Sequence, residues 1–275
     1  MLRRHRFGVP ALLIVSVYLA VVAGAAVLVS ATGELGALWR VTLFTEVDED
    51  AAVTWPNVLV LCATGLAWAW ALWQSLRGPL AGPSPILDRG VRRLRAGLYA
   101  AAAASWLFAV IPSWPRGTEI LYAMVMCAVV EWFQPVLRRN LTRVAHMGTV
   151  GVLGYGGSAV FAALDGPASP VPDGLPLVCV VAALVWTVLA LRAQWRDGRW
   201  RRATVRYGIA ALLAPLGLMS AGPLLALTGE LHLDAAGAAV GTLMLVWLAR
   251  SAHELADPPR QLAAPPAPLS AQPHP

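Results

Sequence analysis

Apolar residues occur along this chain in long blocks, and short polar or charged segments separate each block from the next. A helix needs about 20 mostly apolar residues to cross the hydrocarbon core of a bilayer. Eight blocks have roughly that length, and they cover residues 8–30, 56–76, 96–112, 118–137, 147–164, 176–193, 204–228 and 236–252. The pattern therefore predicts an all-α fold, a polytopic membrane bundle of eight transmembrane helices.

The first block follows Arg3, Arg4 and Arg6, which is also how a secretory signal peptide begins. Its apolar run covers residues 9–31 and is longer than the roughly 7–15 apolar residues of a signal peptide. We therefore interpret this block as a retained span.

Composition supports a membrane protein and argues against a soluble one. Hydrophobic residues make up 58% of the 275 residues, charged residues only 13%, and the mean hydropathy is +0.63. A soluble globular domain carries about 25% charged residues. A chain with about half that charge and this many apolar residues is expected to lie in a bilayer.

The charged residues predict an orientation, because short arginine-rich loops stay on the cytoplasmic side of a membrane. The chain has no lysine, and all 21 basic residues are arginines. With the N-terminus inside, 19 of the 21 arginines fall on inner segments, whereas ten of the 15 acidic residues fall on outer segments. The prediction is an N-in/C-in protein of the plasma membrane, which in a bacterium is the inner membrane.

The distribution of the charged residues also indicates which partners to expect. The calculated pI of about 9.9 would suggest nucleic acid in a soluble protein, but here the arginines are spread over loops that have a topological reason to be basic. We therefore expect membrane lipids as partners and no nucleic acid. A cytoplasmic protein that contacts the inner arginine-rich loops or the C-terminal tail is a further possible partner.

Two regions differ in composition. Residues 1–255 hold all the apolar blocks and are predicted to form the transmembrane bundle. Residues 256–275 are rich in proline and alanine, a composition typical of a disordered extension, here on the cytoplasmic side. Within the bundle, Gly154 and Ser158 have the spacing of small residues that predicts close contact between two helices.

Glu131 is the candidate catalytic residue. It lies in the block 118–137, and a carboxylate near the middle of a bilayer costs about 3 kcal/mol on insertion scales. Gln134, three residues further on, could hydrogen-bond to it on the same helix face. Burial would favour the protonated form, so Glu131 could act as a general acid. The alternative is a structural glutamate that pairs with a neighbouring helix.

A candidate substrate site is suggested by aromatic residues and prolines inside the blocks. Deep tryptophans could line a cavity for an apolar or cationic molecule, and two prolines eight residues apart would kink or interrupt a helix near such a cavity. Packing in the core is the alternative role for both kinds of residue. The candidate substrate-binding residues are Trp68, Trp106, Trp132, Trp186, Pro215 and Pro223.

No nucleotide-binding loop, catalytic triad or zinc-protease motif occurs, and the histidines lie in loops, at span ends or in the tail. We therefore expect no cofactor and no metal site. Three classes of function stay open: a noncatalytic sensor, regulatory or accessory membrane subunit is favoured, followed by a small-solute transporter. The third is a membrane-embedded enzyme, such as a cyclase or transferase, that acts on a lipid-like or isoprenoid substrate with Glu131 as general acid.

Overall fold

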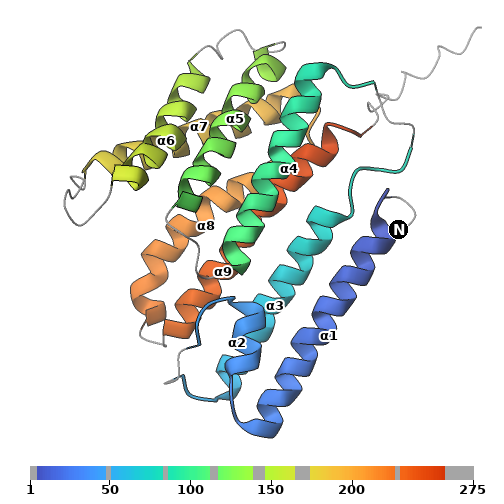
Figure 1. Ribbon diagram of the computed structural model, residues 1–275, viewed down its shortest axis with the longest axis vertical. Helices are drawn as coiled ribbons and strands as arrows, with labels where there is room; N and C mark the ends of the chain where they lie inside the picture. Colours follow the sequence, from blue (N-terminus) through green and yellow to red (C-terminus); the bar gives the residue numbers. More distant parts are fainter. Residues whose placement is uncertain are drawn as a thin grey trace, which may run out of the picture.

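The computed structural model describes residues 5–47, 51–82, 86–111, 117–138, 146–164, 174–226 and 230–257. The regular secondary structure of these residues is helical (Figure 1). The helices are α1 (Gly8–Thr32), α2 (Gly36–Thr42), α3 (Trp55–Leu76), α4 (Arg89–Val110), α5 (Gly117–Arg138), α6 (Met147–Leu164), α7 (Gly174–Asp197), α8 (Arg202–Ala226) and α9 (Glu230–Glu254). Most of the predicted tail, residues 258–275, lies outside the described residues.

Each of the eight predicted blocks coincides with a long helix, so the positions of α1 and of α3 to α9 follow the apolar pattern. In the described part of the chain, six helices are long and apolar enough to cross a membrane: α1, α3, α6, α7, α8 and α9. The protein is thus an all-helical bundle of the multi-pass membrane type. In α5 the apolar stretch is the shorter Ile120–Val136, and α4 begins with several arginines. The count of eight spans and the orientation stay predictions.

Local sequence signals explain several helix ends. The Thr54 hydroxyl accepts a hydrogen bond from the Asn57 backbone N–H at the start of α3, at 3.4 Å. The Asp88 carboxylate accepts one from the Val91 N–H at the start of α4, at 2.8 Å. Both are N-caps, which satisfy backbone donors that have no partner within the helix. Gly33 ends α1 with a φ of +72°, a left-handed conformation that glycine adopts without a steric cost.

Helix α9 is central to the bundle, since it packs against α3, α4 and α8. Helices α5, α6 and α7 form one side, and α1 lies at the opposite edge against α2 and α3 (Figure 1). The largest buried cluster joins α4, α5, α7 and α9 and includes Leu98, Met126, Phe133, Trp186 and Trp247. Many large apolar side chains of α1 and α7 are instead exposed, as expected for surfaces that face lipid.

Glycines let α6 approach α7 closely. A Cβ atom at Gly154 would collide with the backbone of Ala183, and one at Gly151 would lie 2.6 Å from the ring of Trp186. The Ser158 hydroxyl donates a hydrogen bond to the Gly154 carbonyl at 2.8 Å, so it is satisfied within α6. The close contact between helices that the spacing of Gly154 and Ser158 predicts is thus found at Gly154.

Gly154→Ala is expected to destabilise the bundle by about 1–3 kcal/mol, because the added methyl group forces α6 and α7 apart. Gly156→Ala in the same helix is the matched control, since its methyl group would meet the Cys127 sulfur at an ordinary 3.6 Å. Thermal unfolding of the purified protein in detergent measures the difference. Equal melting temperatures for the two variants would contradict the close α6–α7 contact.

Candidate functional site

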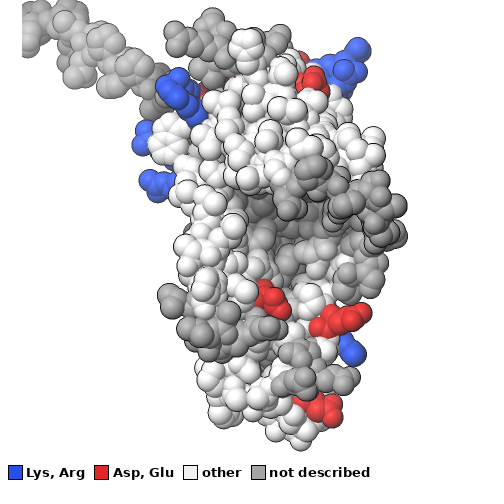
Figure 2. All heavy atoms as spheres, turned by 90° about the vertical axis from the view of Figure 1, so that its left-hand side faces the viewer, with Lys and Arg blue, Asp and Glu red and all other residues white. Residues whose placement is uncertain are grey.

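A chamber of about 700 Å³ lies between α7 and α8 and is completed by α4, α5, α6 and α9. It exists because α7 and α8, although consecutive in sequence, contact each other sparsely, whereas α6 packs closely on α7 and α8 on α9. Figure 2 looks onto the side where α6 and α8 lie and shows a hollow in the middle of this face. The volume is within the range of about 300–1,000 Å³ that is typical of small-molecule sites.

The chamber has mainly apolar walls with a few neutral hydroxyl groups. Leu212, Leu216 and Met219 of α8 and Leu184 of α7 supply part of the apolar surface. The polar lining side chains are Ser105, Tyr122, Tyr155, Ser158 and Thr187. Such a lining fits a mostly apolar molecule that carries an uncharged polar group.

The hydroxyl groups are held in place by their surroundings. Tyr122 pairs with Ser105, and Tyr155 pairs with Thr187. Thr187 also donates a hydrogen bond to the Ala183 carbonyl at 2.9 Å, which fixes its rotamer. The Tyr155 ring stands edge-on to Trp186, with centroids 5.7 Å apart. Each of the two tyrosine hydroxyls therefore has a neighbouring hydroxyl in the chamber wall.

Two of the candidate substrate-binding residues lie at or next to the chamber. Pro215 lines it, and Trp186 is buried behind Tyr155. Pro223 is exposed, and α8 continues as one helix through both prolines.

The other three tryptophans lie elsewhere. Trp68 is buried against Phe44, with ring centroids 5.5 Å apart. Trp106 packs on a small cluster around Ala71, and Trp132 lies over Gly97. The structure does not bring these tryptophans together in one cavity, and a role in substrate binding stays a prediction.

Glu131 is exposed on the surface of α5 and is not part of the chamber lining. The Gln134 side chain lies against Gly148 of α6. A catalytic role for Glu131 stays a prediction that the chamber does not depend on.

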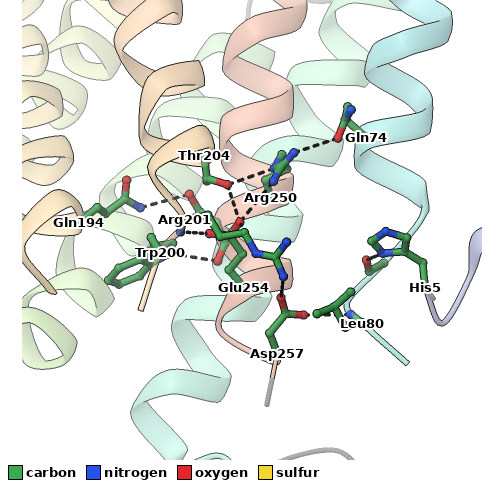
Figure 3. Close-up of polar contacts among 12 residues, drawn as sticks. His5, Gln74, Leu80, Gln194, Trp200, Arg201, Thr204, Arg250, Glu254 and Asp257 are labelled. Carbon is green, nitrogen blue, oxygen red and sulfur yellow. Dashed lines mark hydrogen bonds and ion pairs between the residues drawn. The ribbon is translucent and has the colours of Figure 1, made fainter. Parts of the chain in front are cut away.

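A second group of polar residues lies at the end of the bundle where α3, α7 and α9 finish and α8 begins, which we call the arginine-rich end (Figure 3). Arg250 of α9 is at its centre, with 9% of its surface exposed. Its guanidinium donates hydrogen bonds to the Thr204 hydroxyl at 3.0 Å, to the Gln74 side-chain oxygen at 3.2 Å and to the Glu254 carboxylate at 3.4 Å.

Glu254 is also buried and has further donors. Its carboxylate accepts hydrogen bonds from the Thr204 hydroxyl and from the Arg201 backbone N–H, both at 2.6 Å. The Arg201 side chain reaches Asp257 at 3.4 Å, and Asp257 accepts a hydrogen bond from the Leu80 N–H at 2.9 Å. This chain of contacts links α8 and α9 to the segment that follows α3.

Neighbouring side chains attach α7 to α9. Gln194 donates a hydrogen bond to the Ser251 hydroxyl at 3.1 Å and accepts one from the Trp247 indole at 3.0 Å. The Trp200 indole donates to the Ser251 carbonyl at 3.2 Å. These contacts fix the end of α7, and the turn after it, against α9.

A cavity of about 20 Å³ lies at this end. Its charged and titratable lining residues are Glu254, Asp257, His5, His253, Arg77, Arg201 and Arg250. That volume holds about one water molecule. Burial, together with the positive charge of Arg77, lowers the pKa of His5 below 6.5. Burial and the charge of Arg250 likewise lower the pKa of Arg77 below its usual range. The arginine-rich end is therefore suited to stabilising the structure, since Arg201 and Arg250 form ion pairs with Glu254 and Asp257.

Along the sequence, Arg250 and Glu254 are not distinguished from the other charges of the predicted inner segments. The available signal was their i, i+4 spacing at the end of an apolar block, which is typical of a pair on one helix face. In the described part of the chain, no group of three or more metal-ligating side chains comes together.

Comparison with known proteins adds no relative: no family model, curated protein or solved structure matches this chain.

Glu254→Ala is expected to destabilise the fold by about 3–5 kcal/mol, because it leaves the Arg250 guanidinium buried without its carboxylate. The double variant Arg250→Met/Glu254→Leu should lose less, since no uncompensated charge remains. Thermal or denaturant unfolding in detergent compares the two. A double variant that is less stable than Glu254→Ala would show that the pair itself contributes most of the stability.

Proposed function

We propose that the protein crosses the plasma membrane eight times, with both termini in the cytoplasm. Helices α4 and α5, of 22 residues each, match the other long helices in length and pack between them in the bundle. Charge supports the orientation: in Figure 2 most of the visible arginines lie near the upper end and most of the visible acidic residues in the lower half. The arginine-rich end then faces the cytoplasm.

Cysteine labelling tests this topology in a variant whose three native cysteines are alanine. A cysteine at Val53, an exposed residue between α2 and α3, should react with an impermeant reagent on intact cells. A cysteine at Ala203, in the first turn of α8, should react only after permeabilisation. Labelling of Ala203→Cys on intact cells would rule out the proposed orientation.

The function that the geometry supports best is the binding of one lipid-like molecule in the chamber by a noncatalytic membrane protein. The single observation behind this proposal is the 700 Å³ chamber itself, with apolar walls and neutral hydroxyl groups. A sensor, regulatory or accessory subunit needs no more chemistry than this.

The exposed rim of the chamber agrees with a ligand that comes from the bilayer. Leu216 and Met219 line the chamber and are 50% and 77% exposed, so the same side chains face the surroundings and the interior. An apolar molecule that enters between α7 and α8 stays in contact with apolar side chains, while the hydroxyls of Tyr122 and Tyr155 can bind its polar group.

Filling the chamber tests the proposal. Gly241 of α9 lines it, and a Cβ atom there meets nothing within 4 Å, so Gly241→Trp places an indole in open space. The probe is a C16 alcohol with a photoreactive diazirine, and mass spectrometry counts its adducts on α7 and α8. We expect Gly241→Trp to reduce these adducts at least tenfold.

Gly217→Trp is the matched control. Gly217 also has open space around it and lies on α8, but it does not line the chamber. It should label as the wild type does. If the two variants label alike, or if the adducts fall outside the chamber, the proposed function is wrong.

A further inference from the structure

The chamber continues toward the arginine-rich end as a narrower groove between α7 and α8. This groove has a volume of about 330 Å³ and shares Leu212 with the chamber. On α7 the lining passes from Ala183 and Thr187 in the chamber to Leu191 and Trp195 in the groove, at helical spacing. The two cavities therefore lie along one continuous face of α7.

Arginines surround the far end of the groove. Arg192 and Arg196 of α7 line it, one turn apart. The Arg202 guanidinium of α8 lies 5.4 Å from the centroid of the Trp195 ring, so it reaches across to a lining residue of α7. All three arginines are exposed.

The nearby acidic residue, Asp197, already has another ion-pair partner. Asp197 forms an ion pair with Arg199 at 2.7 Å, and Arg199 also donates a hydrogen bond to the Val136 carbonyl at 2.9 Å. Within the described residues, no ion pair engages Arg192 or Arg196. In the described part of the chain, two guanidinium groups without an ion-pair partner thus stand at the mouth of an apolar groove.

We propose that this groove binds an anionic phospholipid, with its phosphate at Arg192, Arg196 and Arg202 and an acyl chain extended toward the chamber. The inference rests on the proposed function, because it identifies the lipid-like ligand by its headgroup. Guanidinium groups suit phosphate through paired N–H donors, and basic pockets between helices on the cytoplasmic side are suited to anionic headgroups.

The combined length of the groove and the chamber agrees with the length of an acyl chain. The lining of α7 extends from Val180 to Arg196, which is about 24 Å at 1.5 Å per residue. One leaflet contributes about 15 Å of hydrocarbon. An acyl chain that starts at the arginines can therefore lie along the apolar wall and end in the chamber.

Native mass spectrometry of the full-length protein in detergent tests the headgroup. The ligands are phosphatidylglycerol and phosphatidylcholine with identical acyl chains. Because each arginine near an anionic lipid contributes about 1 kcal/mol, Arg192→Gln/Arg196→Gln should weaken phosphatidylglycerol binding about 30-fold and leave phosphatidylcholine unchanged. The control Arg92→Gln/Arg93→Gln removes two exposed arginines of α4 and should bind as the wild type does.

A second variant separates a lipid from free phosphate. Ile209→Trp fills the groove without changing its charge, so it should also weaken phosphatidylglycerol binding at least tenfold. Inorganic phosphate at millimolar concentration should not compete. If Ile209→Trp has no effect and phosphate competes, the arginines bind phosphate alone and the inference is wrong.

The failures of the two proposals can be told apart. Suppose that the arginine variants bind phosphatidylglycerol like the wild type, while Gly241→Trp still blocks labelling by the alcohol. The proposed phospholipid headgroup is then wrong, but the proposed binding of a lipid-like molecule in the chamber is retained. If Gly241→Trp leaves labelling unchanged, the chamber function itself is wrong, and the inference falls with it.

Discussion

The buried ion pair between Arg250 and Glu254 is the interaction on which the arrangement of the helices depends. Removing a guanidinium and a carboxylate from water costs several kcal/mol for each ion, and only well-placed partners offset that cost. Arg250 finds its partners on three helices, namely Gln74 on α3, Thr204 on α8 and Glu254 on α9. The ends of α3 and α9 and the start of α8 are therefore fixed relative to one another.

This fixed end explains why a chamber opens further along the bundle. Gln194 attaches α7 to α9, and Thr204 attaches α8 to the same helix, so α7 and α8 are both held at one end. Near that end Gly208 lets α8 approach Leu191 and Trp247 closely. Further along, α7 stays against α6 and α8 stays against α9, and the two helices separate. The chamber is the space that this separation leaves.

The sequence predicted the helices well, because an apolar block long enough for a bilayer is a local property that can be read directly. The close contact at Gly154 was also predictable, since small-residue spacing is local. The short helix α2 was missed, because its seven residues lie in a segment interpreted as a loop. Its indole at Trp39 is buried and donates a hydrogen bond to Thr45 at 3.0 Å, a tertiary reason that no local pattern reveals.

The site was harder to predict, because it depends on which helix faces point toward each other. Trp68 and Trp186 were candidate cavity residues, but both are buried in packing contacts. Glu131 was a candidate because a carboxylate inside a bilayer costs free energy, yet its side chain is exposed on the surface of the bundle. Glu254 is only four residues from Arg250, but the partners Thr204 and Gln74 are 46 and 176 residues away, so no local window contains them.

The groove and chamber together have the polarity profile of one leaflet. Arg192 and Arg196 stand at the arginine-rich end, apolar side chains such as Leu191 and Leu212 follow, and the hydroxyls of Tyr155 and Thr187 lie beyond them in the chamber. A phospholipid has the same order, with charge at one end and hydrocarbon beyond it. A molecule that moves from the bilayer into the groove can thus keep each part in the environment that it leaves. The chamber hydroxyls are the part of the site that a plain acyl chain does not use. They favour a chain that carries a polar group along its length or at its end, because a hydroxyl buried against hydrocarbon alone lacks one of its hydrogen-bond partners.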